Sequence, residues 1–471
     1  MSDDPGTRTG MVMETIRRRM ASRALVPGEK LPSIRGLAAS LHVSPSTVVE
    51  AYDRLAAEGL IRSRPGSGFY ASGPVPPLAL AEIGPRLDRA LDPFWVSRQS
   101  LDADAAMPKP GCGWLPAEWM PNAALRRAAR GLARADDAVL AYYGSTRGPL
   151  ALRRLLARGF AEEGLDVGPD QILLTGSGTQ AIDLICRFLL RPGDTVLIDD
   201  PGYFNFQALL RAHRVGIVGV PHTASGPDPD RFAEAVAAHR PRLYLTNSAL
   251  HNPTGATLSP AVAHRVLNAA AAHDVTIVED DIFAEFEPDP SPRLAALDGL
   301  ARVIRIGSFS KTLSASVRCG YVAARPDWIE ALVDLQVATS FGGVSPVAAA
   351  LVLGVLGDGG YRKHLDALRR RLAGARREVA ARLDPLGIRP WLMPRGGFYL
   401  WCRLPEGGDA AALARSALRE GVVLAPGDVF SVSQTASGLM RFNVAQMGDP
   451  RVFPVLERAL ASACERTAPA A

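Results

Sequence analysis

The sequence is short of lysine, of paired cysteines and of long apolar runs. Only four of its 53 basic residues are lysines, Lys30, Lys109, Lys311 and Lys363, and the rest are arginines. We therefore ask of each lysine why it is not an arginine. Its five cysteines are scattered, with no C-x-x-C pair, which argues against a disulfide framework and a zinc ribbon. No signal-peptide pattern and no bilayer-length apolar stretch is present. We therefore expect a cytoplasmic protein with reduced thiols, no metal and no membrane partner.

Composition divides the 471 residues into three zones. Residues 1–73 carry ten basic and seven acidic side chains, so they hold +3 of the chain's net charge of +5, which suits a phosphate-facing surface. Residues 74–110 contain seven prolines, which predicts a linker with one short helix near residues 81–91. Residues 111–471 alternate short apolar runs with longer helical patterns. At about 100–200 residues per domain, the chain has room for two to four domains and a sizeable core.

The alternation beyond residue 111 predicts an α/β fold. Short apolar runs are separated by Ala-, Leu- and Arg-rich segments, a pattern typical of βαβ units with a mostly parallel sheet and helices on both faces. We expect a large part over about residues 140–330 and a small part over about residues 331–471. The predicted strands are Ile172–Thr175, Val196–Ile198, Leu243–Thr246, Val275–Val278 and Val303–Ile306.

Residues 31–60 carry the pattern of two short helices joined by a tight turn. Ser33 is a suitable N-cap for the first helix, and Ser44, which precedes a proline, is a suitable N-cap for the second. The second helix presents Ser46 and Thr47 in its first turn, where hydroxyl and backbone N–H groups can meet phosphates or base edges. This spacing predicts a helix-turn-helix unit.

A hairpin follows, with Arg62 and Arg64 on its first strand and Gly66 and Gly68 at its turn. The arginines of such a wing would reach a DNA backbone or minor groove, whereas the plainer interpretation is a three-helix domain with a surface hairpin. The run GEKLPSIRGLAASLHVSPSTVVEAYDRLAAEGLIRSRPGSGFY resembles the winged-helix DNA-binding domain of the GntR family nearly from end to end. The resemblance implies operator contacts by the wing glycines and by Arg35, Ser44, Ser46 and Thr47.

One position departs from that family. Pro45 stands where the family often has a basic residue, which removes one base or phosphate contact. The operator sequence therefore does not carry over from the family to this chain.

Lys311 ends the run SFSK, just after the predicted strand Arg302–Ile306. Ligands of open α/β sheets gather at the carboxyl ends of strands. An amine in that place whose pKa is lowered can form an imine with a carbonyl group. A lone lysine in a loop is more often a solvated surface residue, so the neighbouring motifs decide the interpretation.

Three motifs supply such neighbours. GSGTQA at 176–181 opens a predicted helix whose first N–H groups can bind a phosphate. VEDDIF at 278–283 offers carboxylates, one of which could pair with a protonated pyridine nitrogen, although capping or solvation would explain them equally well. HNPTG at 251–255 offers an asparagine amide. Arg318 is a second phosphate candidate, and Arg441 could hold a carboxylate in a bidentate pair.

In order and spacing, these motifs resemble the class I and II aminotransferases, fold-type I enzymes that use pyridoxal 5'-phosphate (PLP), over about residues 110–460. The resemblance implies that Lys311 forms the internal aldimine and that Asp280 pairs with the pyridine nitrogen. It also implies that Asn252 hydrogen-bonds the cofactor's phenolic oxygen and that Tyr203 stacks on the ring. The phosphate would be held by Ser177, Gly178, Thr179, Ser308, Ser310 and Arg318.

The same resemblance assigns three more residues. Arg441 would bind the α-carboxylate of an amino acid, and Tyr143 would reach the phosphate of the partner subunit, which implies a homodimer. The segment 111–116 would fold back over the pocket, so Trp114 is a candidate effector contact, with a core aromatic as the equal alternative.

One departure bears on activity. The family has a tyrosine two or three residues after the aspartate, where this chain has Ile282 and Phe283. Loss of that hydroxyl should raise the aldimine pKa without preventing cofactor binding, and it weakens the case for efficient transamination.

The whole chain resembles the MocR subfamily of GntR regulators, which joins a winged helix to an aminotransferase-like domain. This implies a PLP-dependent, DNA-binding transcriptional regulator that senses an amino acid, an amine or a B6 vitamer through aldimine chemistry, with residues 74–110 transmitting the change. The first alternative is an active aminotransferase that carries a DNA-binding head. The second is a repressor whose large domain binds no cofactor.

Overall fold

The structure of the protein is a computed structural model that describes residues 7–21, 25, 29–64, 67–72, 101 and 106–467. The chain divides into two compact units, Met1–Ile83 and Gly84–Ala471. The helix predicted near residues 81–91 and Gly66 of the wing turn lie outside the described residues. Within the described ranges, no helix has both the length and the apolar character needed to cross a membrane.

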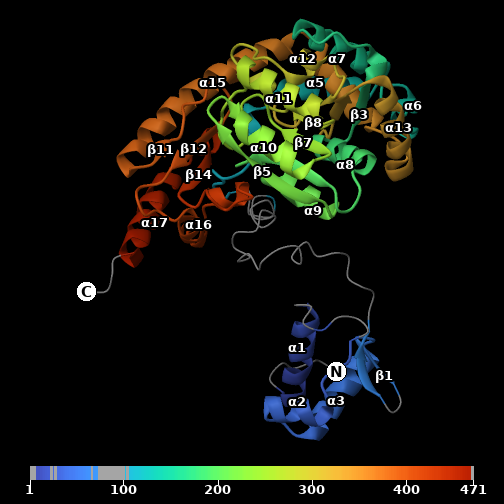
Figure 1. The fold of residues 1–471 in the computed structure, drawn as a ribbon, viewed down its shortest axis with the longest axis vertical. Coiled ribbons are helices and arrows are strands. Elements are labelled where there is room, and N and C mark those ends of the chain that lie inside the picture. Colours follow the sequence, from blue (N-terminus) through green and yellow to red (C-terminus); the bar gives the residue numbers. More distant parts are fainter. Residues whose placement is uncertain are drawn as a thin grey trace. The chain divides into compact units, whose positions relative to one another are not determined.

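The first unit has three helices and a hairpin, drawn in blue in Figure 1: α1 (Arg8–Ala21), α2 (Ile34–Leu41), α3 (Pro45–Ala57), β1 (Ile61–Arg64) and β2 (Gly68–Ala71). Both predicted caps are confirmed, because Ser33 accepts a hydrogen bond from the Gly36 N–H and Ser44 accepts one from the Thr47 N–H. His42, at φ 53°, ends α2 and makes the tight turn. The helix-turn-helix and its wing therefore form as predicted.

One hydrophobic core holds this unit together. Val12 and Ile16 of α1 pack with Leu37 of α2 and with Val48 and Tyr52 of α3, and all five are buried. The Tyr52 hydroxyl donates a 2.9 Å hydrogen bond to the carbonyl of Pro32, which fixes α3 against the start of α2. The orientation of α3, and of its outward face, is set by this core.

The second unit is built on an eight-stranded sheet in the order β3-β10-β9-β8-β7-β4-β5-β6. β4, β5, β7, β8 and β9 are mutually parallel, whereas β10 runs antiparallel to β3 and β9, and β6 runs antiparallel to β5. The prediction of a mostly parallel sheet is confirmed. The strands are β3 (Ile172–Thr175), β4 (Thr195–Asp200), β5 (Gly216–Thr223), β6 (Gly226–Pro227), β7 (Leu243–Thr246), β8 (Thr276–Asp280), β9 (Val303–Ser308) and β10 (Gly320–Ala323).

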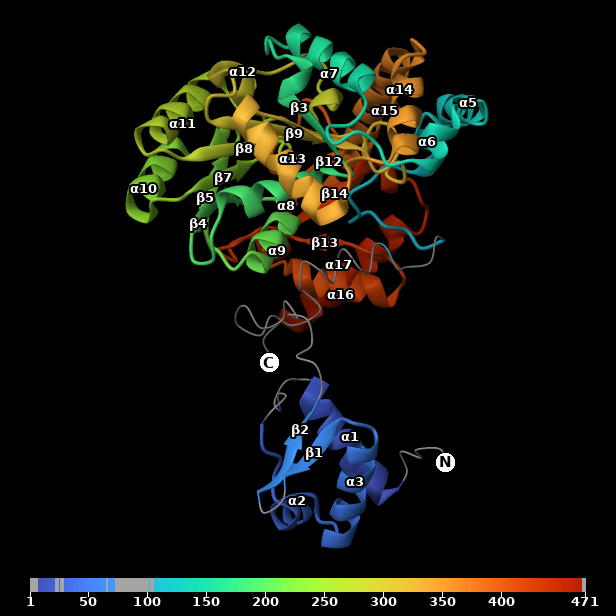
Figure 2. The ribbon, with the colours of Figure 1, turned by 90° about the vertical axis from the view of Figure 1, so that its right-hand side faces the viewer.

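Helices cover both faces of this sheet (Figure 2). Leu197 of β4 packs into one core with Phe232, whereas its neighbours Val196 and Ile198 pack into another with Phe206. Successive residues of β4 thus point into different cores, and both faces of the strand must be apolar because both are buried. One core includes α7 (Leu150–Glu162), α10 (Pro229–His239), α11 (Pro260–Ala272) and α12 (Leu294–Asp298), and the other includes α8 (Gly178–Leu189), α9 (Phe204–Ala212) and α13 (Pro326–Ser340).

A second, antiparallel sheet has the order β11-β12-β14-β13 and its own core, in which Leu372, Phe398 and Phe442 are buried. It lies with α16 and α17 in the red part of Figure 1. Its strands are β11 (Arg389–Pro390), β12 (Tyr399–Arg403), β13 (Ala425–Pro426) and β14 (Leu439–Asn443). The remaining helices are α5 (Asn122–Leu132), α6 (Asp137–Ala141), α14 (Pro346–Leu356), α15 (Gly360–Leu383), α16 (Ala410–Arg419) and α17 (Val452–Thr467). Short 3-10 turns are η3 (Ala117–Trp119), η4 (Pro169–Gln171), η5 (Ala284–Phe286), η6 (Asp384–Leu386), η7 (Gly427–Phe430) and η8 (Val444–Gln446).

Candidate functional site

A cavity of about 430 Å³ opens at the carboxyl ends of β8 and β9, within the usual range of small-molecule sites. The predicted cofactor and effector residues line it together, with Tyr143 as the one exception: Trp114, Ser177, Gly178, Thr179, Tyr203, Asn252, Asp280, Ser308, Ser310, Lys311, Arg318 and Arg441. Residues more than 300 positions apart thus meet around one cavity, which we call the cofactor cavity.

Lys311 presents its amine inside the cofactor cavity. Its Nζ donates a 2.6 Å hydrogen bond to the carbonyl of Gly113. Removal from water lowers the pKa of Lys311 to about 8, with the Arg441 charge adding to the effect. About a tenth of this amine is therefore neutral, and nucleophilic, at pH 7, and about half of it at pH 8.

Asp280 is the last residue of β8 and lines the same cavity as Lys311. Burial raises the pKa of its carboxyl group to about 7, although the Ile282 N–H donates to Oδ1 at 3.2 Å and favours the charged form. Asn247 donates a 2.9 Å hydrogen bond to the Asp280 carbonyl and holds the strand end in place. A carboxylate in this state gains from a cationic partner, such as a protonated ring nitrogen.

The opening turn of α8 forms an anion cradle. Ser177 caps the helix and accepts from the Gln180 N–H at 3.0 Å, and the 12-residue helix directs its first N–H groups toward the cavity. Ser308 donates to Ser310 at 2.8 Å, and Arg318, exposed at φ 53°, brings a positive charge. β10 approaches so closely here that a Cβ on Gly320 would stand 2.7 Å from the Ser177 carbonyl carbon.

Arg441 and Asn252 form a buried pair on the other wall. Arg441 donates at 2.8 Å to Asn252 Oδ1 and at 2.7 Å to the Gly111 carbonyl, and its guanidinium lies 4.2 Å from the Tyr399 ring centroid. Within the part of the chain that the structure describes, its Nε has no hydrogen-bond partner. A carboxylate ligand could satisfy this nitrogen at small desolvation cost, since the guanidinium is already buried.

The segment Gly111–Leu115 folds back over the cavity, as expected. The Trp114 carbonyl accepts from Asn443 at 2.7 Å, and the Gly111 N–H donates to Val423 at 2.8 Å. Gly111 is required for this path because a Cβ there would stand 2.4 Å from the Leu424 carbonyl carbon. Trp114 is half-buried and lines the cavity.

These residues fit PLP. They supply an amine for its aldehyde, a carboxylate for its ring nitrogen, a helix N-terminus with an arginine for its phosphate, and an aromatic side chain at Tyr203. The Arg441 Nε has no hydrogen-bond partner among the described residues, and the pKa values of Lys311 and Asp280 are strongly shifted. Both features are typical of an active or binding site and do not stabilise the fold.

Tyr143 lies apart from this cavity within its own chain. Its side chain is 77% exposed and packs edge-on against Phe341, which is 69% exposed, with ring centroids 4.9 Å apart. Leu140 and Tyr142 are exposed beside it. We call Leu140, Tyr142, Tyr143 and Phe341, three of which are aromatic, the aromatic patch.

Sequence reasoning missed Tyr399, whose hydroxyl faces the cofactor cavity near Gly113. A Cβ on Gly113 would stand 3.2 Å from this hydroxyl and 3.8 Å from Lys311 Nζ. Phe283, in the place of the family's tyrosine, is buried against Phe398 and Tyr399. Tyr399 belongs to β12, in a sheet that the periodicity did not predict, so only a three-dimensional fold could reveal it.

The candidate DNA-facing residues lie at the starts of α2 and α3 and on the hairpin. The Ser44 hydroxyl lies 2.8 Å from those of Ser46 and Thr47, so this first turn carries three coupled hydroxyl groups. Arg35 and Arg62 are exposed. Arg64 is exposed too, and its guanidinium lies 4.4 Å from the Tyr70 ring centroid.

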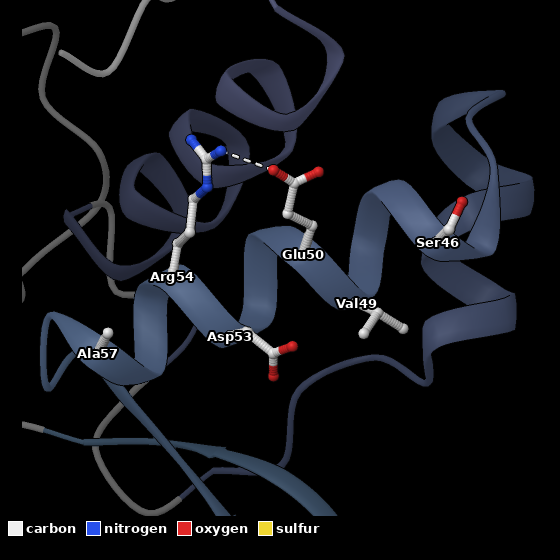
Figure 3. A pocket seen from close by; sticks show the side chains of 6 residues that line it. All are labelled: Ser46, Val49, Glu50, Asp53, Arg54 and Ala57. Atoms are coloured by element: carbon white, nitrogen blue, oxygen red, sulfur yellow. Dashed lines mark hydrogen bonds and ion pairs between the residues drawn. The ribbon is translucent and has the colours of Figure 1, made fainter. Parts of the chain in front are cut away.

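Figure 3 shows the outward side of α3, of which sequence reasoning singled out Ser46 as a DNA contact but not Glu50, Asp53 or Arg54. Ser46, Val49 and Asp53 follow one another along it, and Glu50 pairs with Arg54 at 2.6 Å. Gly68, at φ +106°, closes the adjoining wing in a left-handed conformation that favours glycine.

A winged-helix head and a PLP-binding fold-type I domain together define a class of transcriptional regulator. The family of class I and II aminotransferases matches residues 116–458, and the gntR family of bacterial regulatory proteins matches residues 8–71. The chain belongs to the class I and II aminotransferase family in its larger domain, and its head is a GntR DNA-binding domain, which is the MocR type of architecture.

Relatives share this arrangement over their whole length. The chain is 29% identical to the Escherichia coli HTH-type transcriptional regulator YdcR, with 92% of this chain and 94% of YdcR covered. It is 26% identical to the Staphylococcus aureus HTH-type transcriptional regulator NorG, with 85% and 92% covered.

Among solved structures, the chain is similar to Thermus thermophilus LysN, an α-aminoadipate aminotransferase complexed with N-(5'-phosphopyridoxyl)-L-leucine. The identity is 27% and the TM-score 0.72, covering 79% of this chain and 95% of LysN. The protein is thus a PLP-binding, DNA-binding transcriptional regulator.

Proposed function

We propose that the large domain senses an amino acid, an amine or a B6 vitamer at Lys311, and that this event changes operator binding by the winged helix. The observation that carries the proposal is that Lys311, Asp280 and Arg441 line one cavity in a chain that also carries a DNA-binding head. When bound, PLP supplies an aldehyde that condenses reversibly with primary amines.

Each residue has one task in this proposal. Lys311 would present its neutral amine to the aldehyde of bound PLP, Asp280 would pair with the protonated ring nitrogen, and Asn252 would orient the ring through its amide. Arg441 binds the carboxylate of an amino-acid effector through its free Nε, and Trp114 closes over the bound effector. An amine effector lacks the carboxylate, so the Arg441 contact separates the two effector classes.

The aromatic patch supports a homodimer in this proposal. Four adjacent exposed apolar side chains are costly in water and mark an interaction surface. Tyr143 within this patch would complete the phosphate site of the partner subunit. A dimer would also carry two winged-helix heads, one for each half-site of a palindromic operator.

The test is a pair of titrations on the full chain loaded with PLP. Amino acids, amines and pyridoxal are added singly while the visible spectrum is recorded, and binding to a labelled operator duplex is followed by fluorescence anisotropy. The effector should change both the spectrum and the DNA affinity, and Lys311→Ala should abolish the coupled change. A spectral change with unaltered DNA affinity would contradict the proposal.

An active aminotransferase is the second candidate, favoured by the complete set Asn252, Asp280, Lys311 and Arg441. Burial of Phe283, without a hydroxyl, argues against efficient turnover. Release of a keto acid under the same titration, with no effect on DNA affinity, would establish this alternative instead.

A further inference from the structure

Five exposed side chains of α3 form a stripe along the helix. They recur at the three- and four-residue spacing that places residues on one face of a helix (Figure 3): Ser46, Val49, Glu50, Asp53 and Ala57. The opposite face of α3, which includes Val48 and Tyr52, is buried in the core of the head. The five exposed residues, which we call the outward stripe, are therefore the part of α3 that is free to enter the major groove of DNA.

The outward stripe is poor in positive charge. Arg54 is the only basic residue of α3, and its Nη2 donates to Glu50 Oε1 at 2.6 Å. Asp53 adds a second exposed carboxylate to the stripe. Because carboxylates repel phosphates, this face is suited to lie over base edges and not along the DNA backbone.

Guanine is the base that the outward stripe is least able to recognise. The commonest specific contact in the major groove joins an arginine or a lysine to the O6 and N7 of guanine. Arg54 could make such a contact only by leaving Glu50, whose carboxylate would then face the DNA without its partner. The stripe must therefore discriminate between bases through groups other than a guanidinium.

Val49 is the apolar side chain in the N-terminal half of the stripe. It is 39% exposed, whereas Val48, next to it, is fully buried. An exposed valine adds little to the core of the head and has no side-chain hydrogen bond to offer. The apolar group that base edges present in the major groove is the C5-methyl group of thymine. Val49 and a thymine methyl are thus chemically matched.

The first turn of α3 sets the place of Val49 relative to the DNA. The hydroxyl groups of Ser44, Ser46 and Thr47 lie together there, next to the free N–H groups of the helix start. Hydroxyl groups and helix N-termini are common phosphate ligands. With this turn at the DNA backbone, the following turn, which carries Val49, lies over the base edges, as the N-terminal residues of recognition helices do.

We propose that Val49 is a specificity-determining residue that contacts the C5-methyl group of one thymine in each operator half-site. The contact depends on DNA binding by the head alone, whichever effector the large domain senses. The base pair beneath Val49 is then A·T, and a G·C pair in its place loses the contact.

Deoxyuridine tests this contact because it lacks only the methyl group of thymidine. An operator is selected from a random duplex library with the PLP-loaded full chain, and each thymine is then replaced singly by uracil. Affinity is measured by fluorescence anisotropy at one salt concentration. One thymine in each half-site should weaken binding about fourfold when replaced, the effect of one methyl-sized group that is no longer buried. An operator in which no uracil replacement weakens binding would overturn the proposal.

Three variants assign the methyl contact to one residue. Val49→Ala removes both methyl groups, and alanine is the better helix former, so α3 stays folded. This variant should bind the thymine and the uracil duplex equally well. Val49→Thr keeps one methyl group and should keep part of the difference. Met11→Ala is the matched control, because it shortens a 43% exposed apolar side chain on α1 of the same head, and it should keep the whole difference.

A thymine preference that persists in Val49→Ala would mean that the methyl group acts through DNA shape or through another residue, and it would overturn the assignment. Loss of the preference in Met11→Ala as well would overturn it too, since the effect would then not belong to the outward stripe.

Discussion

At the scale of single residues, the site is defined by two buried groups with opposed pKa shifts. Burial lowers the pKa of Lys311 to about 8 and raises that of Asp280 to about 7. Below these values the lysine is protonated and the aspartate neutral, which is the wrong state of both groups for holding PLP. Above them, the amine is free and the carboxylate is charged.

Affinity for PLP should therefore rise with pH between about 6 and 9, with the largest change between about 7 and 8, where both groups change state. Absorbance titrations at fixed pH values measure it. Pyridoxine 5'-phosphate has no aldehyde, so its affinity should keep only the Asp280 dependence and serves as control. A pH-independent affinity for PLP would contradict this account.

Tyr399 offers the hydroxyl group that Phe283 lacks. Tyr399→Phe keeps the ring beneath Arg441 but removes that hydroxyl, so the pH midpoint of the visible PLP band should rise by up to about one unit, as loss of one hydrogen bond implies. Tyr70→Phe, in the head, is the control. An unchanged midpoint in Tyr399→Phe would mean that this hydroxyl does not act on the cofactor.

The residues at the site were largely predictable because they occupy motifs at strand ends, where order and spacing identify them. Lys311, Asp280 and Asn252 all line one cavity. Tyr399 and the free Nε of Arg441 were not predictable, because they depend on how two sheets meet. Hydrophobic periodicity describes one helix or strand at a time and carries no information about contacts between sheets.

At the scale of elements, α3 and the hairpin offer different chemical groups to DNA. The exposed side of α3 offers hydroxyl, apolar and carboxylate groups, which suit base edges, whereas Arg62 and Arg64 on β1 suit phosphates. This division predicts different consequences for substitutions on the two elements.

Arg62→Ala should weaken binding to operator and unrelated duplexes by similar factors and reduce the slope of log affinity against log salt concentration by about 1. Anisotropy titrations at several salt concentrations measure both quantities. Ser63→Ala, its exposed neighbour on β1, is the matched control. Loss of affinity for the operator alone would instead assign Arg62 to base recognition.

The elements themselves were predicted unevenly. The central strands β3, β4, β7, β8 and β9 fall within a few residues of their predictions, because strands buried on both faces read as continuous apolar runs. β10, β12 and the pairing of β12 with β14 were not predicted, although the run MRFNVA around Arg441 was interpreted as a short strand, as β14 is. Their antiparallel pairing depends on partners distant in sequence, and the local pattern of a four- or five-residue strand is too short to reveal it.

At the scale of the whole molecule, the aromatic patch predicts that the cofactor site is completed by a second copy. Tyr143→Phe should lower PLP affinity about three- to tenfold by removing one hydrogen bond to the partner's phosphate site. Phe341→Arg should shift the protein toward monomer and lower PLP affinity further. Sedimentation velocity and absorbance titration measure the two effects, with Met393→Arg, another exposed apolar position, as control. A dimer unaffected by Phe341→Arg would place the interface elsewhere.

The hydrogen bond from Lys311 Nζ to the Gly113 carbonyl joins the reactive amine directly to the segment 111–115. Residues 111–115 come directly after the proline-rich stretch that joins the two units, and they are tied down by Arg441 and Asn443 as well. Any reaction at the Lys311 nitrogen competes with its bond to Gly113. Chemistry at the Lys311 nitrogen would therefore act first on residues 111–115, on the same side of the sheet as the cofactor cavity.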